Sequence, residues 1–120
     1  MAVPDGLQDP AGASWDNRWH VPYLLDRPGK QEGQIAFFVD NGSNLAEYPK
    51  WQALFREHQP PALLIWGKND PIFPVSGAHP NKRDLEDLEF HLLDTGHFSL
   101  EEFAPEIAER IIALKRRLAQ

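Results

Sequence analysis

From residue 49 onward, hydrophobic positions alternate between the period of a helix and that of a strand. Apolar side chains at helical spacing follow Pro49, and the proline pair at 60–61 ends this predicted helix. The continuous apolar run at 62–66 predicts a strand buried on both faces, and the alternation at 88–92 predicts a strand with one apolar side. A short helix is expected from Ser76 onward, and a longer helix ends the chain. This order of helices and strands predicts an α/β fold.

The last predicted helix has both a start signal and an apolar stripe. Ser99 and Glu102 have the spacing of a capping box, and Pro105 suits the first turn of a helix. The helix is predicted to be amphipathic, because its apolar residues recur on one side. This stripe consists of Ile107, Ile111, Leu114 and Leu118.

Before residue 49 the pattern of apolar residues is weaker. Residues 1–14 are rich in Pro, Gly, Asp and Ala and have no apolar period, so we expect a mobile or loosely docked arm. The aromatic and leucine side chains of 15–25 have a spacing of about four, which suggests one helix face, although Pro22 interrupts it. The segment 31–39 fits either a helix or a strand, and 41–44 predicts a turn.

The composition is that of an ordinary globular domain. Of the 120 residues, 42% are hydrophobic and 25% are charged, which argues against disorder and against a membrane protein. Twelve basic and eighteen acidic residues give a net charge of −6, so nucleic acid is not an expected partner. Without cysteine there is no disulfide, no thiolate zinc site and no cysteine nucleophile. The sequence shows neither a membrane span nor a secretory start, and we expect a cytoplasmic protein.

Asp70 and His97 are the residues that point to chemistry, because each follows a predicted strand. If the strands are parallel and adjacent, a right-handed crossover brings both residues to the same carboxyl edge of the sheet. A carboxylate that accepts the Nδ1 proton of an imidazole leaves Nε2 free to act as a base. The alternative is structural: Asp70 closes a turn that contains proline, and His97 fills the entry of a helix.

Two motifs around these residues resemble a known family. The segments 64–73 (LIWGKNDPIF) and 92–98 (LLDTGHF) are similar to the end of α/β-hydrolases of the epoxide hydrolase and haloalkane dehalogenase-like group. The resemblance implies that Asp70 is the acid and His97 the base of a catalytic triad. It also implies a carboxy-terminal part of the fold: the last two parallel strands with flanking helices, preceded by the end of a cap.

The same resemblance suggests how the chain is organised. Residues 15–45 would form the end of the cap-like helical region and the return to the main domain, and residues 46–120 would form the core segment. Pro80 departs from the family pattern, because it lies early in the expected crossover helix, where it removes a hydrogen-bond donor.

The nucleophile of this family is missing from the sequence. It would lie on an elbow between strand and helix, within G-x-S-x-G or G-x-D-x-G, and neither pattern occurs. No serine lies in such an elbow, which excludes as nucleophiles Ser14, Ser43, Ser76 and Ser99. We therefore expect a truncated hydrolase for an ester, epoxide or carbon-halogen bond, which acts on a small molecule only when an amino-terminal half completes it.

Two other interpretations stay open at this point. The chain could be a non-catalytic module that forms homo-oligomers or binds a partner through an exposed strand flank, or a gene remnant without selected function. No metal or cofactor is expected, because the sequence lacks paired ligand spacing and a phosphate-binding glycine loop. Paired ligand spacing is absent among the other histidines of the chain, His20, His58, His79 and His91.

Overall fold

The computed structural model describes residues 23–120, which fall into two compact units that divide between Glu57 and His58. The predicted arm at 1–14 lies outside the described residues, and so does most of the aromatic segment at 15–25. The predicted domain boundary after residue 45 stays a prediction. Within residues 23–120, no helix is both long and apolar enough to cross a membrane.

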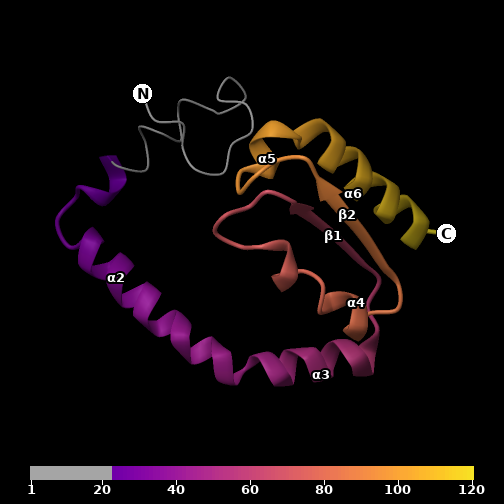
Figure 1. Ribbon diagram of the computed structural model, residues 1–120, viewed down its shortest axis with the longest axis horizontal. Helices are drawn as coiled ribbons and strands as arrows, with labels where there is room; N and C mark the ends of the chain where they lie inside the picture. Colours follow the sequence, from indigo (N-terminus) through magenta and orange to yellow (C-terminus); the bar gives the residue numbers. More distant parts are fainter. Residues whose placement is uncertain (1–22) are drawn as a thin grey trace. The chain divides into compact units, whose positions relative to one another are not determined.

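The first unit is helical. It contains α2 (Lys30–Asp40), the 3-10 helix η2 (Asn41–Ala46) and α3 (Tyr48–His58), whose last residue belongs to the second unit (Figure 1). The segment 31–39, which fitted a helix or a strand, is helical, and Pro49 lies in the first turn of α3 as predicted. The predicted turn at 41–44 is one part of η2.

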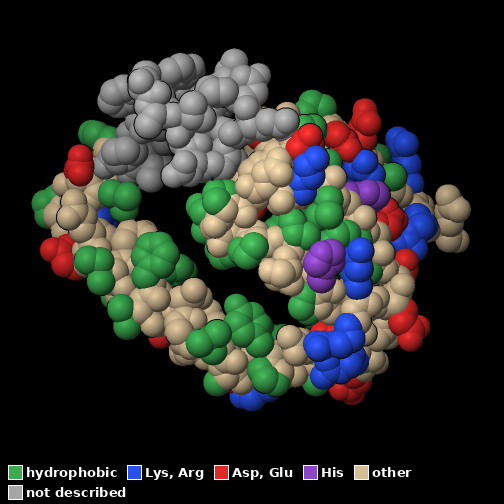
Figure 2. Space-filling model, viewed as in Figure 1, with side chains coloured by type: hydrophobic (Ala, Val, Ile, Leu, Met, Phe, Trp, Pro, Cys, Tyr) green, Lys and Arg blue, Asp and Glu red, His purple; other side chains and the backbone are tan. Residues whose placement is uncertain are grey.

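Side chains of α2 that are large and apolar are exposed. Phe37, Phe38 and Val39 have 72%, 73% and 75% of their surface exposed. Figure 2 shows hydrophobic side chains along this helix. Among the described residues, α2 therefore contributes little to a hydrophobic core.

The second unit is built on two parallel strands. Strand β1 (Ala62–Gly67) pairs with β2 (Leu88–Leu93), so that Ala62 lies opposite Leu88 and Gly67 opposite Leu93. After β2 come α5 (Ser99–Glu102) and α6 (Ala104–Leu118). Both predicted strands and the terminal helix are confirmed, and so is the α/β class.

The crossover between the strands is short and irregular. It consists of the 3-10 helix η3 (Val75–Gly77) and the single-turn helix α4 (Asn81–Asp84), and Pro80 directly precedes α4. Gln59, which follows α3, forms hydrogen bonds with the end of the crossover. Its side-chain amide donates to the carbonyl of Asp84 (3.1 Å) and accepts from the amide of Glu86 (2.9 Å).

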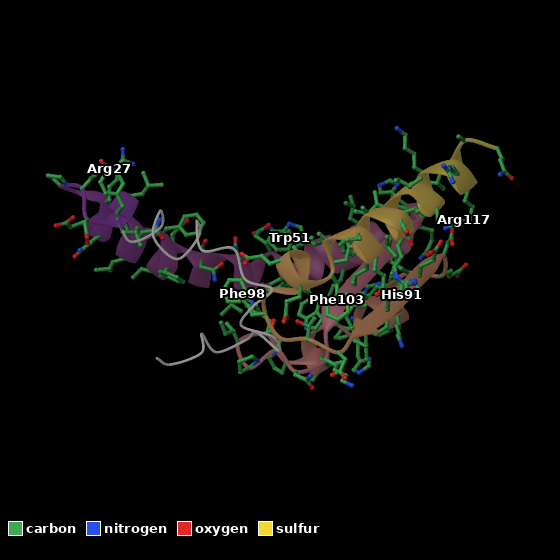
Figure 3. The ribbon with its side chains drawn as sticks, turned by 90° about the horizontal axis from the view of Figure 1, so that it is seen from above. Arg27, Trp51, His91, Phe98, Phe103 and Arg117 are labelled. Atoms are coloured by element: carbon green, nitrogen blue, oxygen red, sulfur yellow. The ribbon has the colours of Figure 1, made fainter. Side chains whose placement is uncertain are left out.

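The two faces of the sheet are covered by different elements. Phe90 stacks on His79 with ring centroids 5.6 Å apart. The next residue is His91, whose Nδ1 lies 2.9 Å from a guanidinium nitrogen of Arg110 in α6. Successive strand residues point to opposite faces, so α6 covers one face and the α4 segment covers the other (Figures 1 and 3). This arrangement leaves the carboxyl edge of the strands for the loops that follow them.

The core of this unit is small. Its buried apolar residues are Ala78, which has no exposed surface, and Leu85, Leu93 and Ile107, with 5 to 7% of their surface exposed. In the predicted stripe of α6, Ile111 is 53% exposed although Ile107 is buried. The predicted full burial of β1 is wrong for the described residues: five of its six residues are half-buried. The physical reason is that their sheet has two strands, so β1 is covered along one edge alone.

Candidate active site

The two loops that carry Asp70 and His97 pack closely at the ends of β1 and β2. Gly67 ends β1, and a Cβ atom built on it would lie 2.0 Å from the carbonyl oxygen of Gly96 and 2.8 Å from that of Thr95. Only a residue without a side chain allows this approach of one backbone to the other. Gly67 therefore determines how near the loop of Asp70 comes to the loop of His97.

Main-chain hydrogen bonds connect the same two loops. The amide of Lys68 donates to the carbonyl of Leu93 (2.9 Å), and the amide of Asn69 donates to the carbonyl of Thr95 (3.0 Å). The first bond continues the pairing of the parallel strands beyond their ends. The second bond joins the residue before Asp70 to the residue two positions before His97, so it places Asp70 and His97 beside each other.

The carboxylate of Asp70 divides its two oxygens between the backbone and His97. Oδ1 accepts hydrogen bonds from the amides of Ile72 (2.8 Å) and Phe73 (2.9 Å), which closes the turn that contains Pro71. Oδ2 lies 2.9 Å from Nδ1 of His97. Asp70 therefore both closes the turn that contains Pro71 and pairs with His97. The Asp70 side chain is 7% exposed, and that of His97 is 31% exposed.

The surroundings of Asp70 keep it ionised. Burial raises the pKa of Asp70, but hydrogen bonds from the Phe73 amide, from His97 and from the Ile72 amide lower it, and the net pKa lies below the ordinary 3.8. A carboxylate at this position is an acceptor only, so Nδ1 is the ring nitrogen of His97 that carries the proton. In a neutral ring with this tautomer, Nε2 has the lone pair.

Aromatic rings flank the imidazole of His97. The ring of Phe73 lies 5.4 Å from it, centroid to centroid, and the ring of Phe98 lies 5.3 Å from it in an edge-to-face arrangement. Phe98 is the residue that precedes α5 (Figure 3). The indole of Trp66 donates to the carbonyl of Phe73 (2.8 Å), which holds the segment after Asp70. The imidazole of His97 therefore lies between apolar aromatic side chains.

The predicted capping box at the start of the last helical segment is wrong. The residue that caps α5 is Phe98, without a side-chain hydrogen bond, and α6 is a separate helix that begins at Ala104. The carboxylate of Glu102 instead accepts a hydrogen bond from the hydroxyl of Thr95, which is fully buried. Sequence reasoning missed Thr95 and Glu102, because no pattern along the chain indicates that they meet.

The other candidate histidines lie elsewhere. His79 stacks on Phe90 and His91 faces Arg110, each on a face of the sheet, and His58 ends α3. His20 lies outside the described residues. Within residues 23–120, no three His, Asp or Glu side chains come together as ligands for a metal ion.

A parallel pair of strands with helices on both faces defines this part of the chain as an α/β protein. Asp70 and His97 lie at the carboxyl edge, where open α/β sheets usually have their sites. Residues 5–104 match the sequence profile of the alpha/beta hydrolase fold, and the chain belongs to this family. The predicted family is thereby confirmed, and the finer assignment to the epoxide hydrolase and haloalkane dehalogenase-like group is not decided by this match.

A relative of the chain is known from yeast. The chain is 40% identical over 91 residues to a protein of Saccharomyces cerevisiae called uncharacterized hydrolase YNR064C. The match covers 76% of this chain but 31% of the yeast protein, so the chain spans less than a third of that relative's length. No solved structure matches the chain.

Proposed function

We propose that the chain supplies the acid and the base of a hydrolytic triad whose nucleophile lies outside these 120 residues. The observation that carries the proposal is the 2.9 Å approach of His97 Nδ1 to Asp70 Oδ2 at the carboxyl edge of the sheet. Membership in the α/β hydrolase family and the name of the yeast relative support a hydrolase. The nucleophile is placed outside because the sequence contains neither elbow pattern.

In this proposal His97 transfers the proton, and Asp70 stabilises the charged form of His97. Nε2 of His97 takes a proton from the nucleophile or from the hydrolytic water, and the imidazolium that forms is stabilised by the negative charge of Asp70. The lowered pKa of Asp70 suits this role, because the carboxylate stays ionised while the ring gains its proton. With an ester or an epoxide, the proton then passes from Nε2 to the alkoxide oxygen of the product, whereas a halide departs as an anion and the proton passes to solvent.

The substrate class that we propose is a small molecule with an ester, epoxide or carbon-halogen bond. Its support is the likeness of segments 64–73 and 92–98 to epoxide hydrolases and haloalkane dehalogenases. A serine nucleophile suits esters, and an aspartate nucleophile suits the other two bonds. The rings of Phe73 and Phe98 beside His97 favour a substrate that is apolar near the bond that reacts.

The test is a chimera in which this chain replaces the matching 91-residue region of the yeast protein. We expect it to hydrolyse whichever of a nitrophenyl ester, an epoxide and a bromoalkane the yeast protein hydrolyses. In the chimera, Asp70→Asn is expected to lower kcat by about four orders of magnitude, because the imidazole loses its orienting acceptor. His97→Gln should abolish turnover, and His79→Gln, on a face of the sheet, serves as the control.

Two results would contradict the proposal. One is a chimera that is folded by circular dichroism but inactive on a substrate of the yeast protein. The other is activity that Asp70→Asn and His97→Gln leave at the level of His79→Gln, since that would mean that the paired side chains take no part in the reaction.

A further inference from the structure

Thr95 is a polar residue with no exposed surface, two positions before His97. Its side chain is 0% exposed, although threonine side chains are mostly found at protein surfaces. A buried hydroxyl needs a hydrogen-bond partner, and here the partner is the carboxylate of Glu102 in α5. Because His97 lies between them in the chain, this bond closes a short loop around the histidine.

The main chain of Thr95 faces the other loop. Its carbonyl accepts the hydrogen bond from the amide of Asn69 (3.0 Å), the residue before Asp70, and its amide donates to the carbonyl of Leu93 (2.9 Å). Thr95 is thus bound on one side to the loop of Asp70 and on the other to the segment that follows His97.

We propose that Thr95 and Glu102 are positioning residues that hold the imidazole of His97 against Asp70. The inference rests on the proposed function, because it assigns these residues to the orientation of the acid and base named there. A carboxylate is a strong acceptor for a hydroxyl, so the bond resists replacement by water inside the loop. When the bond between Thr95 and Glu102 is present, Nδ1 of His97 stays within hydrogen-bonding distance of Asp70 Oδ2, and Nε2 stays free.

A second connection between the loops offers a matched control. Asp94 accepts a hydrogen bond from the side chain of Asn69 (3.0 Å) and lies 2.9 Å from Nζ of Lys68. The side chains of Asp94 and Lys68 are 57% and 46% exposed, so water competes for these contacts. We assign the orientation of His97 to the buried bond of Thr95, and Asp94→Ala should not disturb it.

The experiment is ¹⁵N NMR of the imidazole nitrogens in the 120-residue chain, at a pH where histidine is neutral. In the unmodified chain His97 is expected to carry its proton on Nδ1, and in Asp70→Asn this preference is lost. Thr95→Val keeps the shape of the side chain but removes the hydroxyl, and it should lose the preference as Asp70→Asn does. Glu102→Leu should give the same loss, whereas Thr95→Ser and Asp94→Ala should retain the Nδ1 proton.

The outcomes separate this inference from the proposed function. If His97 in the unmodified chain matches His97 in Asp70→Asn, the acid and the base are not paired, and both proposals are overturned. If His97 is held by Asp70 but Thr95→Val and Glu102→Leu leave it unchanged, the positioning role alone is overturned. Circular dichroism checks that each variant is folded, and if Thr95→Val is not, Glu102→Leu decides the question.

Discussion

Replacing Gly67 with alanine perturbs the closest approach of the two loops that carry the candidate site. The new methyl group would lie 2.0 Å from the carbonyl oxygen of Gly96, 2.8 Å from that of Thr95 and 2.9 Å from the carbonyl carbon of Gly96. Real Cβ atoms essentially never come within 3.0 Å of such neighbours. All three atoms belong to the backbone, so no side chain can rotate away to relieve the contact.

The cost of Gly67→Ala follows from what must move. The loop of Gly96 has to retreat by about 1 Å or more to bring the shortest contact to 3.0 Å. This movement stretches the hydrogen bonds from Lys68 to Leu93 and from Asn69 to Thr95, each of which contributes about 1 kcal/mol. Overpacking itself costs about 1 to 3 kcal/mol. We therefore expect a loss of about 3 to 5 kcal/mol in the free energy of unfolding.

The assay is unfolding in urea, followed by tryptophan fluorescence. With a slope of about 1 to 2 kcal/mol per molar urea, the expected loss lowers the midpoint by about 1.5 M or more. The control is Gly77→Ala in the same unit, where an added Cβ would meet nothing within 4 Å and the midpoint should hardly change. Equal midpoints for Gly67→Ala and Gly77→Ala would refute the reasoning, because the close approach would then impose no constraint.

Two further predictions concern the carboxylate of the site and the packing of α6. The pKa of Asp70 is lower in the folded chain than the ordinary 3.8, so its charge stabilises the fold above about pH 4, and this contribution is lost as the pH falls through the folded value. In Asp70→Asn, the free energy of unfolding should therefore fall less steeply as the pH is lowered from about 5 to about 2. An unchanged pH dependence would contradict this account. Ile107→Ala should cost about 2 to 5 kcal/mol in urea unfolding, because Ile107 is 5% exposed and leaves a cavity. Ile111→Ala, at a position that is 53% exposed, should cost less than about 1 kcal/mol, and similar losses for both would count against the assigned packing.

Much of the second unit could be predicted from local patterns. The apolar run at 62–66 and the alternation at 88–92 became β1 and β2 with boundaries one residue longer, because period and side-chain type act over a few neighbouring residues. The parallel pairing then brought Asp70 and His97 to one edge, as two strands joined by a crossover require. The segment 31–39 could not be decided this way, since its apolar residues fit two periods.

The sequence by itself determined the α/β order, the two strands and the pair of residues at their ends. Tertiary structure alone decided that Gly67 lies against Gly96 and that Glu102 bonds to Thr95. The spacing of Ser99 and Glu102 fits a capping box, but the carboxylate of Glu102 accepts a hydrogen bond from the hydroxyl of Thr95, in the loop before α5. Such partners depend on how the loops fold and pack in space, which no local period of hydrophobic residues encodes.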